Sequence, residues 1–412
     1  MNERTLEMLQ CPFCGTSLTV VHNKALRIIR DQILEGVLGC ECCAFPVIDG
    51  TPILLADDKT RTALRHLETG NRNDALQTVL NLDNTQMPSV LQLDSNQPST
   101  TYRELLNVLC LDAEKDYFLY RFSDPTYFAT ESILSTLAHE MNPTGLALDL
   151  CGGSGHVTRT LLNTKSFKNV VVTDVHFWKL FLATRIVAPD AIAVCCDANS
   201  PLPFPTKIFS TILLSDAFPY IWHKRLLAGE MERVMSEDGL IVMPHLHSTN
   251  GYNYSAGNTL SPSAYQSLFR SLTPRLFNDE TIVNNLISTK TIDFSCDATS
   301  DELNTASSLA LLATRNSHFF RRFSLYEEWN VTGVLRTNPL YEVDYKNGQS
   351  TLTLRFPTED YENEFGESKR YLPTTLSVSG DLRSPLLPAQ FGSQYSELRH
   401  RRVLLDLPLR YC

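Results

Sequence analysis

A short apolar run that ends in an aspartate and opens directly into a glycine-rich turn is the feature that most constrains this chain. In LALDLCGGSGHVTRTLL, a buried strand is predicted to end at Asp149 and a helix to start near Val157. Glycines in such a turn let a ligand approach the backbone closely. Four more apolar runs follow between stretches with helical spacing: NVVVTD, AIAVCCD, FSTILLSD and GLIVMPH. This alternation predicts an α/β fold with a doubly wound, mostly parallel sheet over residues 144–288.

Acidic and small side chains stand where the next three predicted strands end. Asp174 ends the second strand, the place where an acid accepts hydrogen bonds from ribose hydroxyls in dinucleotide-binding folds. Asp197 follows the third strand and is expected to accept from an adenine amino group, with Ala198 as a backbone donor. The fourth run ends at Ser215 and Asp216, over the same cleft. A nicotinamide site would normally have a third glycine at position 158, where this chain has threonine.

Together these features resemble the class I S-adenosylmethionine-dependent methyltransferases, particularly the ubiquinone and menaquinone biosynthesis type (methyltransferase type 11). The first motif of that family reads D-x-G-x-G-x-G or D-L-C-C-G-T-G, and here a cysteine replaces its first glycine. The resemblance covers residues 120–244 approximately. It implies the class I methyltransferase fold, S-adenosylmethionine as cofactor and methyl transfer as the reaction. The residues expected to bind this donor are Asp149, Cys151, Gly153, Gly155, Asp174, Val175, Asp197, Ala198 and Ser215.

Two cysteine clusters near the N-terminus predict a metal site. CPFC supplies Cys11 and Cys14, and CECC supplies Cys40 with either Cys42 or Cys43. Two such pairs with a 25-residue spacer between them can place four thiolates around one zinc ion. The spacing from the third cysteine favours Cys43 as the fourth ligand, and the alternative for the whole set is buried free thiols.

The sequence around these cysteines is similar to the small zinc-ribbon proteins that activate eukaryotic tRNA and release-factor methyltransferases, and to their bacterial relatives. The matching segment, FPVIDGTPILL, corresponds to a YPI-DGIP-LL strand, turn and strand in that family. The resemblance covers about 56 residues. It implies a structural zinc and a docking role for this segment.

Two histidines follow the fifth predicted strand, at the edge of the sheet where an open α/β fold places its substrate. Oxygen acceptors and many nitrogen acceptors need a base. His245 and His247 are therefore predicted as catalytic residues, with His245 ranked first because it is nearer the strand end; polar loop residues are the alternative. His223 is a third candidate. Further polar side chains follow in the same loop, namely Asn250, Tyr252, Asn253, Tyr254 and Asn258.

Two segments outside the sheet are candidates for closing the site. The aromatic segment 117–128 precedes the fold and is expected either to cover the donor or to pack as a helix on the sheet. The segment 355–373, rich in tyrosine, phenylalanine, glutamate and arginine, is expected either to close the acceptor pocket or to form a surface extension.

Four regions are predicted along the 412 residues: a zinc ribbon at 1–56, a helical linker and lid region at 57–143, the methyltransferase core at 144–288, and a β-rich extension at 289–412 that completes the sheet and the acceptor pocket. In the last region, YEVDY and STLTLRF read as strands joined by an Asn347-Gly348 hairpin turn. The sequence does not indicate an oligomeric state.

The net charge and the cysteine content indicate which compartment and which class of methyl acceptor to expect. A net charge of -10 argues against a grip on nucleic acid, which needs a basic face. Eleven cysteines form a poor disulfide framework and favour the cytoplasm, and no secretory signal or membrane-spanning stretch is apparent. The expected acceptor is a small molecule, such as a natural product, a sugar or a quinone-like metabolite, methylated at O, N or C. RNA or protein methylation and a non-catalytic donor-binding partner are the alternatives.

Overall fold

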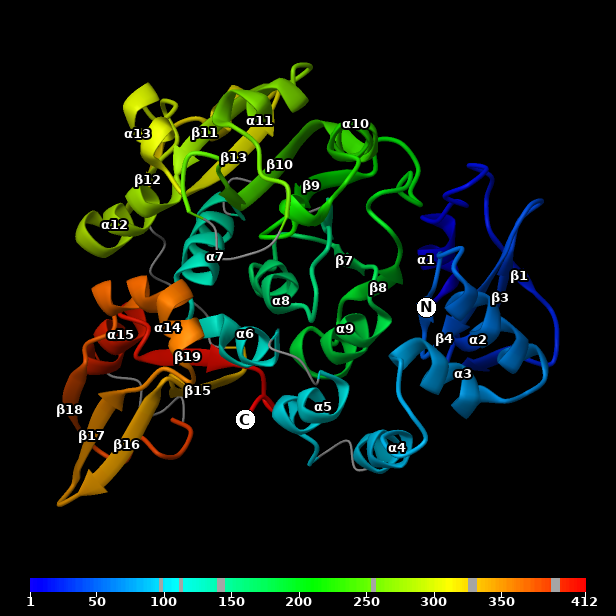
Figure 1. Cartoon of the computed structure of the whole chain (residues 1–412), viewed down its shortest axis with the longest axis horizontal. Helices are drawn as coiled ribbons and strands as arrows, with labels where there is room; N and C mark the ends of the chain where they lie inside the picture. Colours follow the sequence, from blue (N-terminus) through cyan, green and yellow to red (C-terminus); the bar gives the residue numbers. More distant parts are fainter. Residues whose placement is uncertain (96–98, 111–113, 139–144, 253–256, 325–331, 387–392) are drawn as a thin grey trace.

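The computed structural model describes residues 1–95, 99–110, 114–138, 145–252, 257–324, 332–386 and 393–412. A seven-stranded sheet lies at its centre, in the order β11-β13-β10-β9-β6-β7-β8 (Figure 1). Six strands run in one direction, and β13 is antiparallel to both of its neighbours. The strands are β6 (Leu146–Asp149), β7 (Asn169–Asp174), β8 (Ile192–Cys195), β9 (Phe209–Leu213), β10 (Met235–His247), β11 (Thr273–Asn278) and β13 (Ser308–Thr314).

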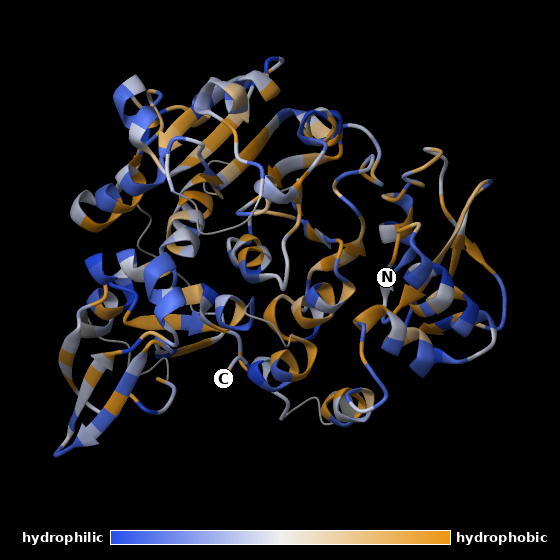
Figure 2. Ribbon diagram, viewed as in Figure 1, coloured by the Kyte–Doolittle hydropathy of each residue, from blue (hydrophilic) through white to orange (hydrophobic). Residues whose placement is uncertain are grey.

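The predicted doubly wound, mostly parallel sheet is therefore confirmed. Its strands are buried on both faces, as in β7, where every residue after Asn169 is buried. Figure 2 shows the corresponding concentration of hydrophobic residues along the central strands. The sheet also extends beyond residue 288, because β13 comes from the region predicted as the C-terminal extension.

Helices connect the strands and cover the sheet. Those of the core are α8 (His156–Asn163), α9 (Phe177–Leu182) with a π-helical turn η2 (Ala183–Val187), η3 (Phe218–Tyr220), α10 (Lys224–Val234), α11 (Pro262–Leu268), α12 (Asp279–Thr289), α13 (Ser300–Thr305) and η4 (Ser317–Phe319). Two short strands, β12 (Thr291–Asp293) and β14 (Arg322–Ser324), pair beside α12.

A second, smaller sheet forms the N-terminal domain, shown in blue in Figure 1. The domain contains α1 (Glu3–Glu7) and the sheet strands β1 (Thr19–Val21), β2 (Arg27–Ile29), β3 (Gln32–Gly39), β4 (Ala44–Ile48) and β5 (Thr51–Pro52). The turn between β4 and β5 places Asp49 and Gly50 at φ 52° and 74°, the left-handed pair that a two-residue hairpin needs.

The N-terminal domain continues the large sheet at its β8 edge. Ile53 forms a parallel bridge with Cys195, and the Leu54 amide donates to the Cys195 carbonyl at 2.8 Å. Arg185 pairs with Asp49 at 2.8 Å beside this junction. The β8 edge is thus covered by the ribbon's own chain rather than left as an open strand.

Helices predominate between the ribbon and the core. They are α2 (Asp58–Glu68), α3 (Arg72–Leu80), α4 (Met87–Ser95), α5 (Tyr102–Leu109), α6 (Glu114–Tyr120), the 3-10 turn η1 (Arg121–Ser123) and α7 (Pro125–Ala138). None of the helices in the described part of the chain combines the length and apolar character that crossing a membrane would require.

The C-terminal region forms a β-rich unit that contacts η1, the turn between α6 and α7 (Figure 1). Its elements are β15 (Val334–Thr337), β16 (Tyr341–Lys346), β17 (Gln349–Leu354), α14 (Glu359–Phe365), η5 (Gly366–Arg370), β18 (Thr375–Ser379), α15 (Ser393–His400) and β19 (Leu404–Leu407). The predicted hairpin turn is confirmed, since Lys346 pairs with Gln349 across Asn347 and Gly348.

Buried polar contacts attach this unit to the core. The Tyr411 hydroxyl lies 2.7 Å from His156 Nε2, at the start of α8. Asp406 pairs with Arg159 of α8 at 3.1 Å, and the Ser123 hydroxyl donates to Asn338 at 2.9 Å. The extension is therefore held against the elements that carry the site.

Candidate functional site

The glycine-rich turn after β6 is shaped by close backbone packing. A Cβ atom on Gly152 would lie 2.6 Å from the Asp149 carboxylate, and one on Gly155 would lie 2.8 Å from the Ala183 Cβ. The Gly152 amide donates to the Thr173 carbonyl at 2.8 Å. A side chain at either glycine would push the turn off the end of the sheet, so the turn keeps its backbone open toward the strand ends. Sequence reasoning missed Gly152, although its place beside Gly153 could have indicated it.

Asp149 lies beneath this turn. It is fully buried, and the Thr158 hydroxyl donates to its Oδ2 at 2.6 Å. Burial raises the pKa of Asp149 to about 7, because the charged form loses its hydration. In this position the carboxylate supports the turn from below, and Thr158, at the position where a dehydrogenase would have glycine, is its partner.

Asp174 links the end of β7 to the same turn. Its Oδ2 accepts from the Gly153 amide at 3.1 Å, and its Oδ1 accepts from the His176 amide at 2.8 Å. A carboxylate has further lone pairs beyond these two bonds, which leaves capacity for ligand hydroxyls. Val175, the next residue, is exposed.

The other predicted donor residues lie at neighbouring strand ends. Asp197 follows β8 and accepts from the Asn199 amide at 2.8 Å, while Ala198 is buried. Ser215 follows β9, and its hydroxyl is 3.5 Å from that of Thr130 on α7. The Phe118 ring of α6 lies 3.4 Å from the place a Cβ on Gly153 would occupy, so the aromatic segment does cover the glycine-rich turn.

A second polar group lies at the ends of β9 and β10. His247 Nε2 is 3.3 Å from Asp216 Oδ1, and His245 Nδ1 is 3.0 Å from Oδ2 of Asp279, the first residue of α12. The centroids of the two imidazole rings are 4.7 Å apart. A register shift in β10 between Met243 and Leu246 accompanies this arrangement, a bulge of the kind that re-aims side chains near sites.

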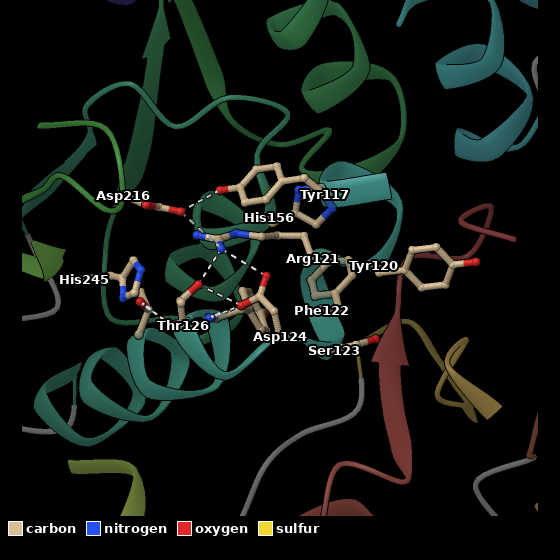
Figure 3. A network of polar contacts seen from close by, with 12 residues as sticks. Tyr117, Tyr120, Arg121, Phe122, Ser123, Asp124, Thr126, His156, Asp216 and His245 are labelled. Carbon is tan, nitrogen blue, oxygen red and sulfur yellow. Dashed lines mark hydrogen bonds and ion pairs between the residues drawn. The ribbon is translucent and has the colours of Figure 1, made fainter. Parts of the chain in front are cut away.

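Helix α6 and the turn after it hold Asp216 from the other side (Figure 3). The Tyr117 hydroxyl donates to Asp216 Oδ2 at 3.0 Å, and the Arg121 guanidinium is 3.6 Å from the same oxygen. Arg121 also pairs with Asp124 at 3.0 Å and donates to Thr126 at 2.5 Å. Figure 3 shows the Tyr117 and Arg121 side chains converging on Asp216.

These contacts set the electrostatics of the group. Burial alone would raise the pKa of Asp216, but the positive charges of His245 and Arg121 and the His247 hydrogen bond outweigh it and hold that pKa well below its usual range. Burial alone would lower the pKa of His245, but the carboxylates of Asp216 and Asp279 outweigh it and raise that pKa. This end of the sheet therefore favours positive charge beside its carboxylates.

A cavity of about 300 Å³ opens beside the two histidines. Asp279 lines it and is 6% exposed; its Oδ1 has no hydrogen-bond partner within the described residues. The segment 355–373 contributes several residues to the wall, so it does line this cavity. The described lining residues are Pro125, Thr126, Ala129, His245, His247, Tyr252, Asp279, Glu280, Val283, Ser307, Ser308, Asn363, Glu364, Phe365, Glu367 and Arg370.

The cavity includes some of the sequence candidates and not others. His245, His247 and Tyr252 line it, while His223 is exposed at the start of α10 and is not among its lining residues. Asn253 and Tyr254 lie outside the described residues. Sequence reasoning missed Asp279, because nothing in its local sequence indicates that it meets a histidine 34 residues earlier.

The N-terminal cysteines also come together. The sulfurs of Cys11, Cys14 and Cys40 lie within 4.8 Å of one another. The Cys43 thiol interacts with those of Cys11 and Cys40, and the exposed Cys42 thiol with that of Cys14.

Each cysteine pair has a turn suited to a metal. The amides of Cys42 and Cys43 donate to Cys40 Sγ at 3.4 and 3.2 Å, and those of Phe13 and Cys14 donate to the Cys11 sulfur. The three sulfurs of Cys11, Cys14 and Cys40 are close enough to fit a zinc ion, and a fourth cysteine would complete a tetrahedral set.

Comparisons with known proteins match two parts of the chain. The family model described as a methyltransferase domain matches residues 148–243, and the model described as Trm112p-like protein matches residues 2–50. No curated protein matches the sequence. The predicted methyltransferase and the predicted zinc-ribbon resemblance are both confirmed.

Solved structures are similar only at a distance. The YcgJ protein of Bacillus subtilis is 15% identical over 46% of this chain and 99% of its own, with a TM-score of 0.33. An S-adenosylmethionine-dependent methyltransferase of Aquifex aeolicus is 10% identical over 48% of this chain and 97% of its own, with a TM-score of 0.33. A structure of the Haloferax volcanii Trm112 methyltransferase activator in complex with a methyltransferase candidate is 17% identical in sequence. The match covers 46% of this chain and 93% of that chain, with a TM-score of 0.34. Similarities this distant do not bear on substrate or partner.

Proposed function

We propose that this chain, an S-adenosylmethionine-dependent methyltransferase that carries a Trm112p-like domain at its N-terminus, methylates a small-molecule acceptor at O, N or C. The observation that carries this proposal is the cavity of about 300 Å³ beside His245 and His247. It lies at the carboxyl ends of β10 and β11, and its volume suits a metabolite rather than a folded macromolecule.

The donor is proposed to lie across the ends of β6 to β9. Asp174 would accept from the ribose hydroxyls, and Asp197 with Ala198 would bind the adenine. The turn at Cys151, Gly153 and Gly155 would accommodate the methionine part close to the backbone. Asp149 would hold the turn, and Val175 and Ser215 would complete the walls. S-adenosylmethionine supplies the activated methyl group, and the chain's own residues bind it, orient it and exclude water.

His245 and His247 are proposed to act on the acceptor. They line the cavity at the end of β10, whereas the proposed donor-binding residues after β6, β7 and β8 lie beyond β9 in the sheet. A hydroxyl or ammonium acceptor must lose a proton before it attacks the methyl carbon. The paired carboxylates of Asp216 and Asp279 orient the two imidazoles for this role.

The N-terminal domain is proposed to bind a structural zinc through Cys11, Cys14, Cys40 and Cys43. Cys43 is preferred to Cys42 because it is less exposed and because its spacing from Cys40 equals that of Cys14 from Cys11. The free thiols throughout the chain support a cytoplasmic location.

Methylation of RNA or of a protein is the second candidate, and the Trm112p-like domain is the observation that favours it. That domain would then serve as a docking surface for a macromolecular substrate or a protein partner. The net charge of -10 and the small size of the cavity favour the first candidate. A non-catalytic donor-binding role is a third candidate.

Labelled methyl groups would separate these candidates. We expect that incubating the full chain with radiolabelled S-adenosylmethionine and a cell extract transfers label to molecules below about 1 kDa, because a cavity of this volume encloses a whole ligand of that size. Mass spectrometry then identifies the acceptor. Label recovered only in RNA or protein would contradict the small-molecule proposal, and bound but untransferred donor would favour the non-catalytic role.

Replacing Asp174 tests the donor site. Asp174→Ala should weaken S-adenosylmethionine binding about 10- to 100-fold, because a hydrogen bond to a charged group contributes about 1.5–3 kcal/mol. Titration calorimetry measures the change. Asp190→Ala is the matched control, because Asp190 is an exposed aspartate that follows α9 and η2. This variant should bind S-adenosylmethionine with normal affinity. Equal affinity in the two variants would show that Asp174 does not hold the ribose.

A further inference from the structure

Two histidines and one carboxylate at the ends of β9 and β10 are close enough to share a cation. One ligand atom from each of Asp216, His245 and His247 lies within 4.8 Å of the other two. Metal–nitrogen and metal–oxygen bonds of about 2.0–2.2 Å would need only a small further approach. We propose that these three residues bind a divalent first-row transition-metal cation. Two imidazoles and one carboxylate leave other coordination positions open, and the acceptor's oxygen or nitrogen would take one of them.

The backbone holds two of the three ligands in an unusual conformation. Asp216 has φ 58° and His245 has φ 55°, both in the left-handed region that residues other than glycine rarely adopt. Such conformations persist where the surrounding structure demands a particular side-chain direction, and they cluster at functional sites. Here both direct their side chains toward one point beside the cavity.

Each of two ligands has an outer partner that leaves its inner atom available. Asp279 holds His245 through Nδ1 at 3.0 Å, so its Nε2 is the atom that would bind a cation. The Tyr117 hydroxyl holds Asp216 through Oδ2, so Oδ1 faces His247. A carboxylate behind a histidine ligand is the usual support of a metal site, since it fixes the ring and increases its basicity.

The charges around Asp216, His245 and His247 also favour a bound cation. Within the described residues, Asp124 and Asp216 pair with one permanent cation, Arg121, while Asp279 pairs with His245. Glu364 of the cavity wall adds a further acid that faces Asp216 and both histidines. Among the three aspartates and Arg121 alone, two negative charges remain if both histidines are neutral ligands. Buried charges are stable only when they are paired or coordinate a metal, and one divalent ion balances this set.

This inference rests on the proposed function and specifies how the histidines act on the acceptor. A hydroxyl bound to the cation would ionise more readily, and its proton would leave to water at the mouth of the cavity. The oxygen lone pair would then attack the methyl carbon. The carbon–oxygen bond forms as the carbon–sulfur bond breaks, and neutral S-adenosylhomocysteine is released. An amine acceptor would follow the same path from its nitrogen.

Manganese binding tests the site without any acceptor. Mn²⁺ prefers nitrogen and oxygen ligands, so it should leave the cysteine site to zinc. We expect the full chain, with its zinc in place, to bind about one Mn²⁺, measured by loss of the free-ion electron paramagnetic resonance signal. Asp216→Asn, His245→Ala and His247→Ala should each raise the Kd at least tenfold, and Asp279→Asn about 10- to 100-fold. His22→Ala, an exposed histidine of the ribbon, is the matched control and should bind Mn²⁺ normally.

The outcomes separate this inference from the proposed function. Retained zinc and retained S-adenosylhomocysteine binding in each variant would show that the chain remains folded. If no divalent ion binds beyond the zinc, or if the Kd is unchanged in all three ligand variants, the metal site is overturned. Methyl transfer by chain that lacks a second metal would overturn it too, while leaving the methyltransferase proposal intact. Failure to bind S-adenosylhomocysteine would contradict the proposed function alone, because the Mn²⁺ titration needs no donor.

Discussion

Replacing both His245 and His247 by alanine is expected to lower methyl transfer to a hydroxyl or ammonium acceptor by about 10²–10⁴-fold. The acceptor must lose a proton to become a nucleophile, and these side chains line the cavity where the acceptor is proposed to bind. S-adenosylmethionine affinity should stay nearly constant, since the donor's proposed contacts lie at other strand ends. Single-turnover rates with labelled donor, combined with calorimetry, separate the two effects.

The matched control for this double variant is His22→Ala, whose side chain is exposed on the N-terminal domain. It should transfer methyl groups at the normal rate. Full turnover by the double variant on the true acceptor would exclude the histidines and direct attention to Tyr252 and to the C-terminal wall of the cavity. A carbon acceptor that needs no base would show a smaller loss, so the acceptor must be identified before the result is interpreted.

Removing the predicted zinc is expected to unfold the N-terminal domain. Structural zinc contributes about 10–16 kcal/mol of apparent binding free energy in small domains, more than so short a segment gains from its own core. Cys11→Ser should therefore abolish the roughly one zinc per chain and lower the thermal midpoint. Elemental analysis and thermal denaturation measure the two changes. The methyl-transfer rate per folded molecule should stay close to normal even though the thermal midpoint falls, because the cysteines lie in a different domain from the cavity.

Cys42→Ser tests the ligand assignment and is the control for this experiment. Cys42 is exposed, and Cys43 has the better spacing from Cys40. The Cys42 variant should keep its zinc and its thermal midpoint, whereas Cys43→Ser should behave like Cys11→Ser. If the Cys42 variant loses its zinc and the Cys43 variant keeps it, Cys42 is the fourth ligand and Cys43 is not. Freshly prepared protein without any zinc would contradict the site as a whole.

The large sheet could be predicted from sequence because its signals are local. A buried strand such as β7 is a continuous run of valines, and the turn after β6 has its glycines in one short segment. The proposed donor residues follow directly from these strand ends, because parallel strands bring their carboxyl ends to one edge. For the same reason His245 and His247 could be selected without any knowledge of their surroundings.

The rest of the site depends on contacts between distant parts of the chain. Asp279 meets His245 only because α12 begins where β11 ends, with β13 between that strand and β10. Tyr117 reaches Asp216 across 99 residues. The cavity wall from α14 depends on a C-terminal unit anchored by buried side chains such as Tyr411. Such contacts leave no periodic pattern in the sequence, so the choice between a pocket wall and a surface extension could not be made from it.

The junction of Ile53 and Leu54 with Cys195 joins two domains of one polypeptide. Their association is therefore unimolecular, and its extent does not change when the protein is diluted or when expression varies. A docking partner supplied as a separate protein would have to find the β8 edge by diffusion and would be shared among competing chains. Here synthesis itself fixes the stoichiometry at one to one, and each enzyme molecule is made with its edge strand already provided.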